Sequence, residues 1–266
     1  MSKRVLYHFT SRYHLPLILH DGFLNLTESN LREPLSGQKM ANVFDSKTLY
    51  KIDKYRFNIL ITKNLNDEFI DLVKNRTNII VHANITGYGG SKLEPNVPKP
   101  DWSICQLGKL IKSGFPKRGI VLRVDPIFNS DKGVRTSINI MQQGIDMGIT
   151  RIRFSFIDTH YKHLQRRFQE AGIEVPPPSP TEHQENILYK LICRNPITTF
   201  ESCAEGLNLN KGCISPHDFA LFGLKPDVNR TNGQQRKNCN CLACKVELLN
   251  QKKRCPHKCL YCYWRG

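Results

Sequence analysis

Short apolar runs alternate with longer amphipathic stretches along most of this chain, and this alternation restricts its fold more than any other feature. The apolar runs are bounded by turn residues, which is typical of strands buried on both faces of a sheet. Strands are predicted at residues 4–9, 57–62, 78–86, 119–127, 151–158 and 198–205. Helices are predicted between them, at residues 15–20, 66–74, 102–113, 137–147, 160–171 and 181–193. Strict alternation implies an α/β fold with a parallel sheet, either a partial TIM-like (β/α)6 barrel or an open sheet.

The alternation stops near Leu224, which predicts a barrel-like domain of residues 1–224 and a tail of residues 225–266. The tail has few apolar residues and carries six of the ten cysteines. It also has ten Lys and Arg residues against Asp227 and Glu247, so it holds a large share of the net charge of +16. Residues 31–49 and the proline-rich residues 174–180 are predicted to be loops.

Targeting signals are not evident in the chain. No apolar run approaches the ~18 residues that a membrane span requires, and the first residues lack the apolar stretch of a secretory signal. We therefore expect a cytoplasmic protein with no membrane partner. In a reducing compartment, clustered cysteines are more typical of metal ligands than of disulfides.

The last cysteines have a spacing that suits an iron–sulfur cluster. Cys255, Cys259 and Cys262 form C-x3-C-x2-C, and Tyr261 stands directly before the third cysteine. Three thiolates at this spacing can hold one face of a [4Fe-4S] cluster and leave the fourth iron open to a chelating ligand, such as S-adenosylmethionine. Zinc is the alternative, because soft thiolates bind either metal and other tail cysteines, or His257, could complete a zinc site.

The C-x3-C-x-aromatic-C pattern resembles the signature of radical S-adenosylmethionine enzymes, which usually carry it near the N-terminus. Its position at the C-terminus resembles instead an uncharacterised bacterial family, domain of unknown function eighteen-forty-eight. Further blocks are similar to that family and occur in the same order, at residues 62–64, 86–89, 93–98, 123–127, 155–158, 203–205 and 213–214. This second resemblance implies no reaction, because the family has none assigned.

The resemblance to radical enzymes implies a mechanism. A reduced cluster would cleave S-adenosylmethionine to a 5′-deoxyadenosyl radical, which takes a hydrogen atom from a substrate. An electron donor such as flavodoxin or ferredoxin is implied as well.

A second set of tail cysteines is also predicted to bind metal. Cys239, Cys241 and Cys244 form C-x-C-x2-C, and the family resemblance implies that the first two are ligands. Three thiolates need a fourth partner, which Cys203 or Cys213 could supply. The set would hold either a second cluster or a structural zinc. Cys105 and Cys193 fall in predicted helices and are expected to be ordinary buried thiols.

Polar residues follow the predicted strands, at the end where barrel enzymes carry their reactive groups. The candidate catalytic residues among them are Arg123, Asp125, Asp158 and Glu205. The candidate cofactor-binding residues are Lys63, Thr86, Gly87, Tyr88, Gly89 and Glu94. Arg123 or Lys63 could pair with the methionine carboxylate, and Asp125 or Asp158 could bind the ribose hydroxyls.

The glycines among these residues permit close approach of the backbone to a ligand. Gly89-Gly90 followed by Glu94-Pro95 loosely resembles the Gly-Gly-Glu-Pro stretch with which radical enzymes hold the amino group of S-adenosylmethionine.

The charge favours a polyanionic partner, either a nucleic acid or a nucleotide-bearing substrate. Tyr261, Tyr263 and Trp264 are interleaved with the basic tail residues and could stack on exposed bases. Three functions therefore stay open: a radical enzyme, a zinc-stabilised nucleic-acid-binding module without catalysis, and a redox iron–sulfur protein that does not bind S-adenosylmethionine.

Overall fold

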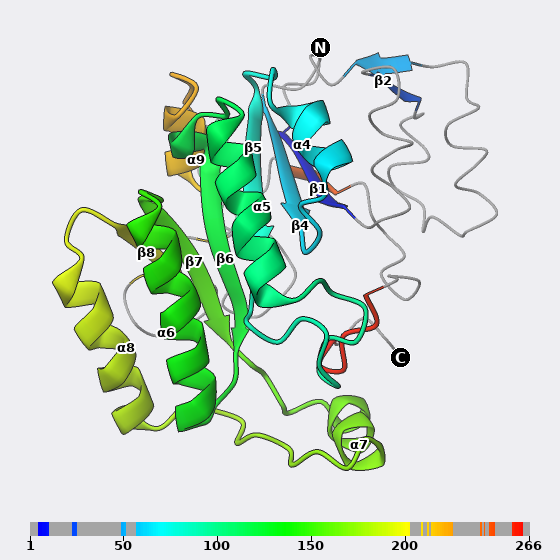
Figure 1. The fold of residues 1–266 in the computed structure, drawn as a ribbon, viewed down its shortest axis with the longest axis vertical. Helices are drawn as coiled ribbons and strands as arrows, with labels where there is room; N and C mark the ends of the chain where they lie inside the picture. Colours follow the sequence, from blue (N-terminus) through cyan, green and yellow to red (C-terminus); the bar gives the residue numbers. More distant parts are fainter. Residues whose placement is uncertain are drawn as a thin grey trace.

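The computed structural model describes the main chain of residues 5–10, 23–25, 49–51, 57–202, 209, 212, 214–225, 240, 242, 245–247 and 257–262. Seven strands form one sheet in which every neighbouring pair is parallel (Figure 1). Their order is β8 (Thr199–Ser202), β7 (Arg151–Phe156), β6 (Ile120–Ile127), β5 (Ile79–Asn84), β4 (Asn58–Thr62), β1 (Val5–Thr10) and β9 (Lys245–Glu247). A separate antiparallel pair consists of β2 (Phe23–Asn25) and β3 (Leu49–Lys51).

The large sheet is wound in one direction. From β4 to β8, strands that follow one another in the described chain are also neighbours in the sheet, as in a β/α barrel. β8 and β9 are the outer strands, and no pairing joins them within the residues described. The predicted parallel α/β sheet is therefore confirmed as an open sheet, and the described strands do not close into a barrel.

Helices connect most of these strands. They are α4 (Asp67–Val73), α5 (Pro100–Lys112), α6 (Asp131–Asp146), α7 (Lys162–Glu170), α8 (Glu182–Arg194) and α9 (Pro216–Ala220), with a 3-10 turn, η2, at Lys117–Gly119. Capping side chains fix several starts: Asn66 accepts a hydrogen bond from Phe69 N, and Thr181 forms a capping box with Gln184. Helices α4, α5, α7 and α8 lie close to the predicted ranges, and these local capping signals fix the starts of α4 and α8.

Helix α6 begins well before its predicted start at residue 137. Ser130 caps it by accepting a hydrogen bond from Gly133 N at 3.0 Å. Glycine disfavours a helix interior, yet Gly133 lies in the first turn of α6. In the structure a Cβ at Gly133 would lie 2.3 Å from the carbonyl oxygen of Phe128. The helix therefore needs a glycine at this position to pack against the preceding loop.

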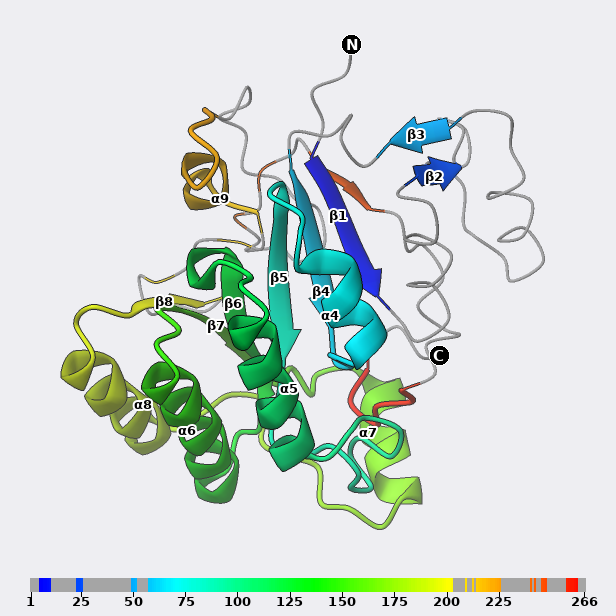
Figure 2. The ribbon, with the colours of Figure 1, turned by 45° about the horizontal axis from the view of Figure 1, so that its top comes forward.

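The two faces of the sheet are covered differently. Helices α4, α5, α6 and α8 lie over one face and share the main apolar core with it (Figures 1 and 2). On the other face, Ile59 and Ile61 of β4 pack with Phe219 of α9 and with Leu242. Leu242 and strand β9 come from the predicted tail, so parts of residues 225–266 join the sheet and its second core.

The prediction that Cys105 and Cys193 are buried was wrong, because both are exposed. On α5 the buried positions include Ile104 and Leu107, which leaves Cys105 on the outer side of the helix. On α8 Leu191 is buried, and Cys193 two positions later faces away. Helical position therefore did not imply burial for either thiol.

Several other predictions fall outside the described residues. These are the helix at residues 15–20, most of the loop at residues 31–49, and the site residues Glu205, Cys203, Cys213, Cys239, Cys241, Cys244 and Cys255. Among the helices that are described, none has the length and apolar character needed to cross a membrane.

Candidate functional site

The sheet face opposite the main helices becomes polar between β5 and β8. Four residues that are partners in register form one row across these strands: Asn84, Arg123, Arg153 and Glu201. Each is at most 7% exposed. Burial of polar and charged groups costs free energy unless they are paired, so this row depends on hydrogen bonds and ion pairs.

Arg123 and Asp125 were both predicted as catalytic residues, and the structure brings them together. They lie two positions apart on β6. Arg123 Nε donates to Asp125 Oδ2 at 2.9 Å, and Arg123 Nη2 contacts the same oxygen. The hydroxyl of Ser155, on neighbouring β7, donates to Asp125 Oδ1. The Asp125 side chain is 18% exposed and that of Arg123 is 7% exposed, so this cluster lies at the accessible edge of the polar row.

A second cluster joins three segments that are far apart in the sequence. Lys63 Nζ donates to Glu94 Oε1 at 2.8 Å, and the hydroxyl of Tyr261 donates to the same oxygen. Lys63 Nζ also lies 5.6 Å from the centre of the Tyr261 ring. The Glu94 side chain is 1% exposed and that of Lys63 is 13% exposed. Two predicted cofactor-binding residues therefore form a buried ion pair with each other.

The electrostatics of this cluster favour its charged form. Burial disfavours the Glu94 carboxylate, but the charge and hydrogen bond of Lys63 outweigh burial, so the pKa of Glu94 lies below its usual value. Burial likewise disfavours the Lys63 ammonium, but attraction to Glu94 and Cys259 raises its pKa overall. Burial and the neighbouring Glu94 carboxylate raise the pKa of Tyr261 well above its usual value. At neutral pH the cluster is therefore Lys⁺, Glu⁻ and a neutral phenol.

The loop of residues 86–98 follows β5 and carries Glu94 at its centre. Gly90 N donates to Glu94 O at 2.9 Å, which folds the loop back on itself. A Cβ at Gly89 would lie 1.8 Å from the carbonyl oxygen of Pro98, and one at Gly87, where φ is +89°, would lie 2.5 Å from Thr136 Cγ2. These glycines were expected to admit a ligand to the backbone. In the structure the space where their Cβ atoms would lie is occupied by the protein's own atoms.

The other predicted residues of this loop line its inner side. Thr86 is buried and its hydroxyl accepts a hydrogen bond from Tyr88 N at 3.4 Å. The ring of Tyr88 packs edge-on against Phe128, with centroids 4.7 Å apart. Phe128 in turn packs edge-on against Tyr261 at 5.6 Å. Tyr88 thus supports the apolar surroundings of Tyr261.

The C-terminal segment of residues 257–262 docks onto this loop. Leu260 N donates to Leu93 O at 2.9 Å, and His257 Nδ1 lies 3.3 Å from Asn96 O. On the other side, Arg167 Nη2 of α7 donates to Cys262 O at 2.6 Å. Figures 1 and 2 both show the segment, in red, beside the loop after β5 and helix α7. The docked cysteine segment therefore lies at the carboxyl end of the parallel sheet.

Two of the predicted metal ligands belong to this segment. Cys259 is buried and Cys262 is partly buried, and neither is part of a disulfide. They form one turn, in which Cys262 N donates to Cys259 O at 3.2 Å. Lys63 is close enough to Cys259 for a charge on the sulfur to raise the pKa of Lys63. Within the described residues, which do not include Cys255, no three His, Cys, Asp or Glu side chains are grouped closely enough to hold a metal ion.

Lys63 and Asp158 differ in how they relate to the two ion-pair clusters at this end of the sheet. Asp125 also raises the pKa of Lys63, after the larger effects of burial, Glu94 and Cys259, so the two ion-pair clusters are neighbours. Asp158 takes part in neither. Its Oδ1 accepts from His160 N at 3.1 Å and lies 2.9 Å from His160 Nδ1, and its side chain is 37% exposed.

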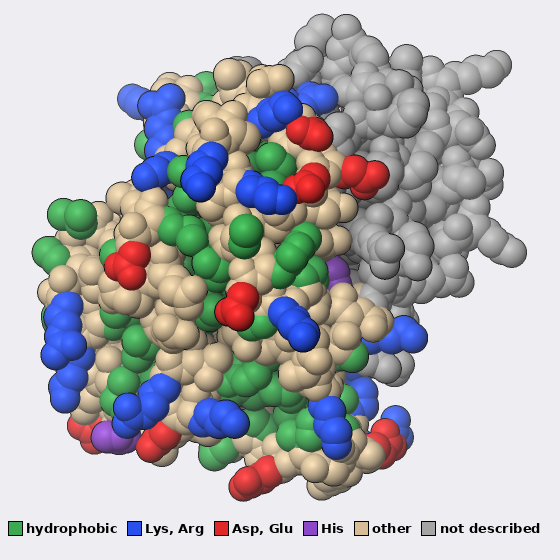
Figure 3. All heavy atoms as spheres, viewed as in Figure 1, with side chains coloured by type: hydrophobic (Ala, Val, Ile, Leu, Met, Phe, Trp, Pro, Cys, Tyr) green, Lys and Arg blue, Asp and Glu red, His purple; other side chains and the backbone are tan. Residues whose placement is uncertain are grey.

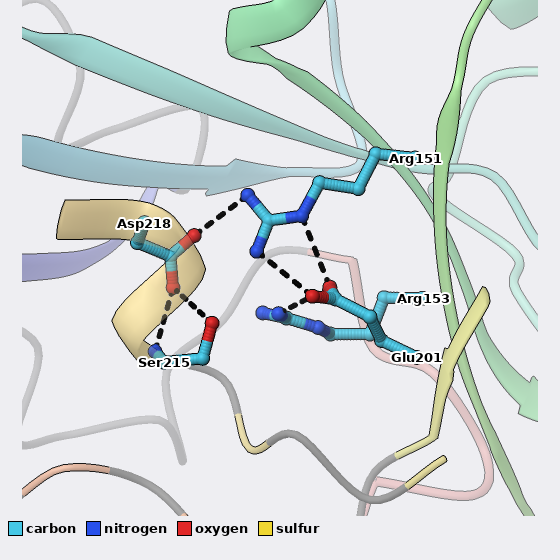
Figure 4. A network of polar contacts seen from close by, with 5 residues as sticks. All are labelled: Arg151, Arg153, Glu201, Ser215 and Asp218. Atoms are coloured by element: carbon cyan, nitrogen blue, oxygen red, sulfur yellow. Dashed lines mark hydrogen bonds and ion pairs between the residues drawn. The ribbon is translucent and has the colours of Figure 1, made fainter. Parts of the chain in front are cut away.

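A buried ion network continues the polar row away from the cysteine segment, and the sequence analysis missed it. Figure 4 shows Glu201 held between Arg151 and Arg153, with Arg151 also reaching Asp218 of α9 at 2.7 Å. Asp218 Oδ2 accepts hydrogen bonds from the Ser215 main-chain N at 2.7 Å and its hydroxyl at 3.2 Å. The alternating Arg-Ile-Arg-Phe-Ser-Phe of β7 was the available signal, because every second residue is polar.

Among the described residues on the face drawn in Figure 3, the basic side chains form no single patch. There, Lys and Arg side chains are scattered, with Asp and Glu between them. The net charge alone therefore does not locate a nucleic-acid interface on that face.

Comparison with known proteins assigns the family. Searches of curated proteins and of solved structures gave no match. Residues 25–264 match the family described as Domain of unknown function (DUF1848). The matched range includes Lys63, the loop that carries Glu94, and the docked cysteine segment, so all three parts of the second cluster lie within it. The chain therefore belongs to the family described as Domain of unknown function (DUF1848).

Proposed function

We propose that this chain is an iron–sulfur enzyme that uses S-adenosylmethionine, with a [4Fe-4S] cluster held by Cys255, Cys259 and Cys262. The observation that carries the proposal is the docking of the cysteine segment onto the loop after β5, through the Leu260–Leu93 and Tyr261–Glu94 hydrogen bonds. These cysteines are at the end of the chain, yet the docking puts Cys259 and Cys262 where parallel α/β enzymes carry their reactive groups.

The surroundings of the segment suit such a cluster. Three thiolates on a [4Fe-4S] cluster bring negative charge, and Lys63 beside Cys259 would partly offset it. Phe128, Phe168 and Tyr261 form an apolar cluster around Cys259. An apolar wall of this kind excludes water, which a reactive intermediate requires. When bound and reduced, the cluster would supply the electron that cleaves S-adenosylmethionine.

The residues that would bind S-adenosylmethionine are best sought in the Arg123 cluster. Lys63 and Glu94 are buried against each other and against Tyr261, so the structure supports them less well as direct contacts. The guanidinium of Arg123 can pair with the methionine carboxylate, and the Asp125 carboxylate can accept hydrogen bonds from the ribose hydroxyls. Asp125 is the most exposed charged group of the two clusters, as such a contact demands.

The proposal is tested by anaerobic purification of the full chain followed by iron, sulfide and zinc analysis. About four irons per chain or more, and a reduced-state electron paramagnetic resonance signal that shifts when S-adenosylmethionine is added, would support it. Stoichiometric zinc without iron, from cells grown with ample iron, would overturn it and favour a zinc-stabilised module. A cluster whose signal does not respond to S-adenosylmethionine would instead indicate a redox iron–sulfur protein.

A further inference from the structure

We propose that Tyr261, Glu94 and Lys63 form a lock that fixes the cysteine segment, residues 257–262, over the carboxyl end of the sheet. In this assignment Lys63 and Glu94 are positioning residues, and they act on Cys259 through Tyr261 and the segment's main chain. Any effect of this lock on the iron–sulfur cluster rests on the proposed function. The lock itself does not, because it concerns how one segment of the chain is held by another.

Glu94 contacts both other members of the lock. One oxygen, Oε1, accepts from Lys63 Nζ and from the Tyr261 hydroxyl. A buried carboxylate that receives an ammonium and a phenol is stabilised by charge-assisted hydrogen bonds. Removing either partner leaves a charge buried with too few donors, so the three side chains depend on one another.

The lock is the polar centre of a larger contact. Around it, Leu260 N bonds to Leu93 O, and Arg167 bonds to Cys262 O. The Tyr261 ring packs against Phe128 and below the Lys63 ammonium. Apolar contacts alone tolerate sliding, whereas a buried hydrogen bond to one carboxylate oxygen fixes the register of the segment.

Cys259 lies two residues before Tyr261 in the same turn. Cys259 is 7% exposed and packs in the apolar cluster that contains Tyr261. Lys63 Nζ lies 5.6 Å from the centre of the Tyr261 ring, so the cluster that contains this thiol adjoins the lock. Opening the lock should therefore expose this thiol before it affects thiols elsewhere.

The experiment measures thiol alkylation in the full chain, reduced and stripped of metal with a chelator. Iodoacetamide labelling of each cysteine is followed by mass spectrometry. The exposed thiols Cys105 and Cys193 act as internal references, because their rates report the reagent and the intact helices α5 and α8. In the unsubstituted chain Cys259 should react at least about tenfold more slowly than Cys105.

Tyr261→Phe is the principal variant, since it removes one oxygen and keeps the ring that packs on Phe128. It should raise the Cys259 to Cys105 rate ratio by about tenfold, the effect of losing one charge-assisted hydrogen bond. Glu94→Gln should do the same. Tyr189→Phe is the matched control, because Tyr189 is 59% exposed on α8, and it should leave the Cys259 to Cys105 ratio unchanged. Since the Tyr189 hydroxyl bonds to Cys193, Cys105 alone is the reference thiol for this variant.

Two variants of Lys63 distinguish a positioning role from a general loss of stability. Lys63→Arg keeps a cation beside Glu94 and should retain most of the protection of Cys259, whereas Lys63→Met should lose it. The proposal is overturned if Tyr261→Phe and Glu94→Gln both leave the rate ratio unchanged, with circular dichroism spectra like the unsubstituted chain. It is also overturned if all variants accelerate Cys193 as much as Cys259, which would indicate global unfolding.

A spectroscopic readout tests the link to the cluster. In iron-loaded protein, Tyr261→Phe should shift the g-values of the reduced signal or broaden it, because the thiolate ligands are held less rigidly. A chain that binds no iron would refute the proposed function, while the alkylation ratios would still decide whether the lock exists.

Discussion

Glu201 lies opposite Arg153 in the register of β7 and β8, and the two side chains form an ion pair with exposures of 1% and 0%. Arg151 binds the other oxygen of the same carboxylate at 3.1 Å and reaches Asp218 at 2.7 Å. Two guanidinium groups and two carboxylates therefore balance in the interior, where one unpaired charge would be costly. Because Asp218 belongs to α9, these pairs also attach that helix to the sheet.

Replacing Glu201 by glutamine should destabilise the protein by about 3–5 kcal/mol, because two buried guanidinium groups would then share one carboxylate. Urea denaturation followed by circular dichroism measures the change in the free energy of unfolding. Glu174→Gln is the matched control: Glu174 is exposed, and its variant should stay within about 0.5 kcal/mol of the unsubstituted chain. Equal stabilities of the two variants would contradict the buried network.

The contribution of Glu201 to stability should depend on pH in the acid range. Burial disfavours its carboxylate, but the charges of Arg153 and Arg151 outweigh burial, so its pKa lies below the ordinary value of 4.5. A pKa that is lower in the folded state stabilises above the pKa of the unfolded chain, and this stabilisation is lost as pH falls through the folded-state pKa. The stability difference between the unsubstituted chain and Glu201→Gln should be constant near neutral pH and shrink below about pH 4.5. A difference that grew on acidification would exclude this explanation.

Much of the fold was predictable because its signals are local. Strands β4, β5, β6 and β7 contain apolar runs, and their starts lie close to the predicted positions. Strand β9 has the sequence Lys-Val-Glu, which carries no strand signal, and it takes its place by pairing with β1. Pairing across a long sequence separation leaves no periodic pattern in the sequence. The predicted alternation of strands and helices therefore stopped near Leu224.

The candidate site was predicted in part. Lys63, Arg123 and Asp125 were selected because of their positions at the ends of strands, and Glu94 because Gly89-Gly90 and Glu94-Pro95 loosely resemble a Gly-Gly-Glu-Pro stretch. The structure places all four at one end of the sheet in two neighbouring clusters. Their mutual pairing was not foreseen, since Glu94 and Tyr261 are 167 positions apart. The Arg151–Glu201 network was missed because these residues lie inside strands, whereas candidate site residues were sought where strands end.

Gly89 should tolerate no side chain, because a Cβ would overlap the carbonyl oxygen of Pro98 and force open the loop that carries Glu94. Gly89→Ala should lower the free energy of unfolding by about 1–3 kcal/mol. It should also raise the alkylation rate of Cys259, which the loop helps to cover.

Gly108→Ala is the matched control, because nothing lies within 4 Å of its Cβ position on α5. There, alanine should stabilise the helix by up to about 1 kcal/mol. Similar melting temperatures for both variants would contradict the tight packing of this loop.

Loss of Cys259 should remove cluster iron while the sheet stays folded, because the thiol is a proposed ligand and its segment covers only one end of the sheet. Cys259→Ala should abolish 5′-deoxyadenosine formation from S-adenosylmethionine, measured by chromatography after anaerobic reduction. Cys105→Ala is the control, since this exposed thiol on α5 lies outside the site. Undiminished 5′-deoxyadenosine formation by Cys259→Ala would contradict the proposed mechanism.

The iron content of cysteine-to-alanine variants should show how many clusters the chain binds. If Cys255, Cys259 and Cys262 hold the sole cluster, each single alanine variant should lose nearly all its iron. If Cys239, Cys241 and Cys244 hold a second cluster with Cys203 or Cys213, a variant of the first set should keep about half. In that case a Cys241→Ala variant should lose the complementary half and keep the signal that responds to S-adenosylmethionine, because the open iron belongs to the three-cysteine set alone. Zinc retained by Cys259→Ala and lost by Cys241→Ala would instead assign the second set to a structural metal.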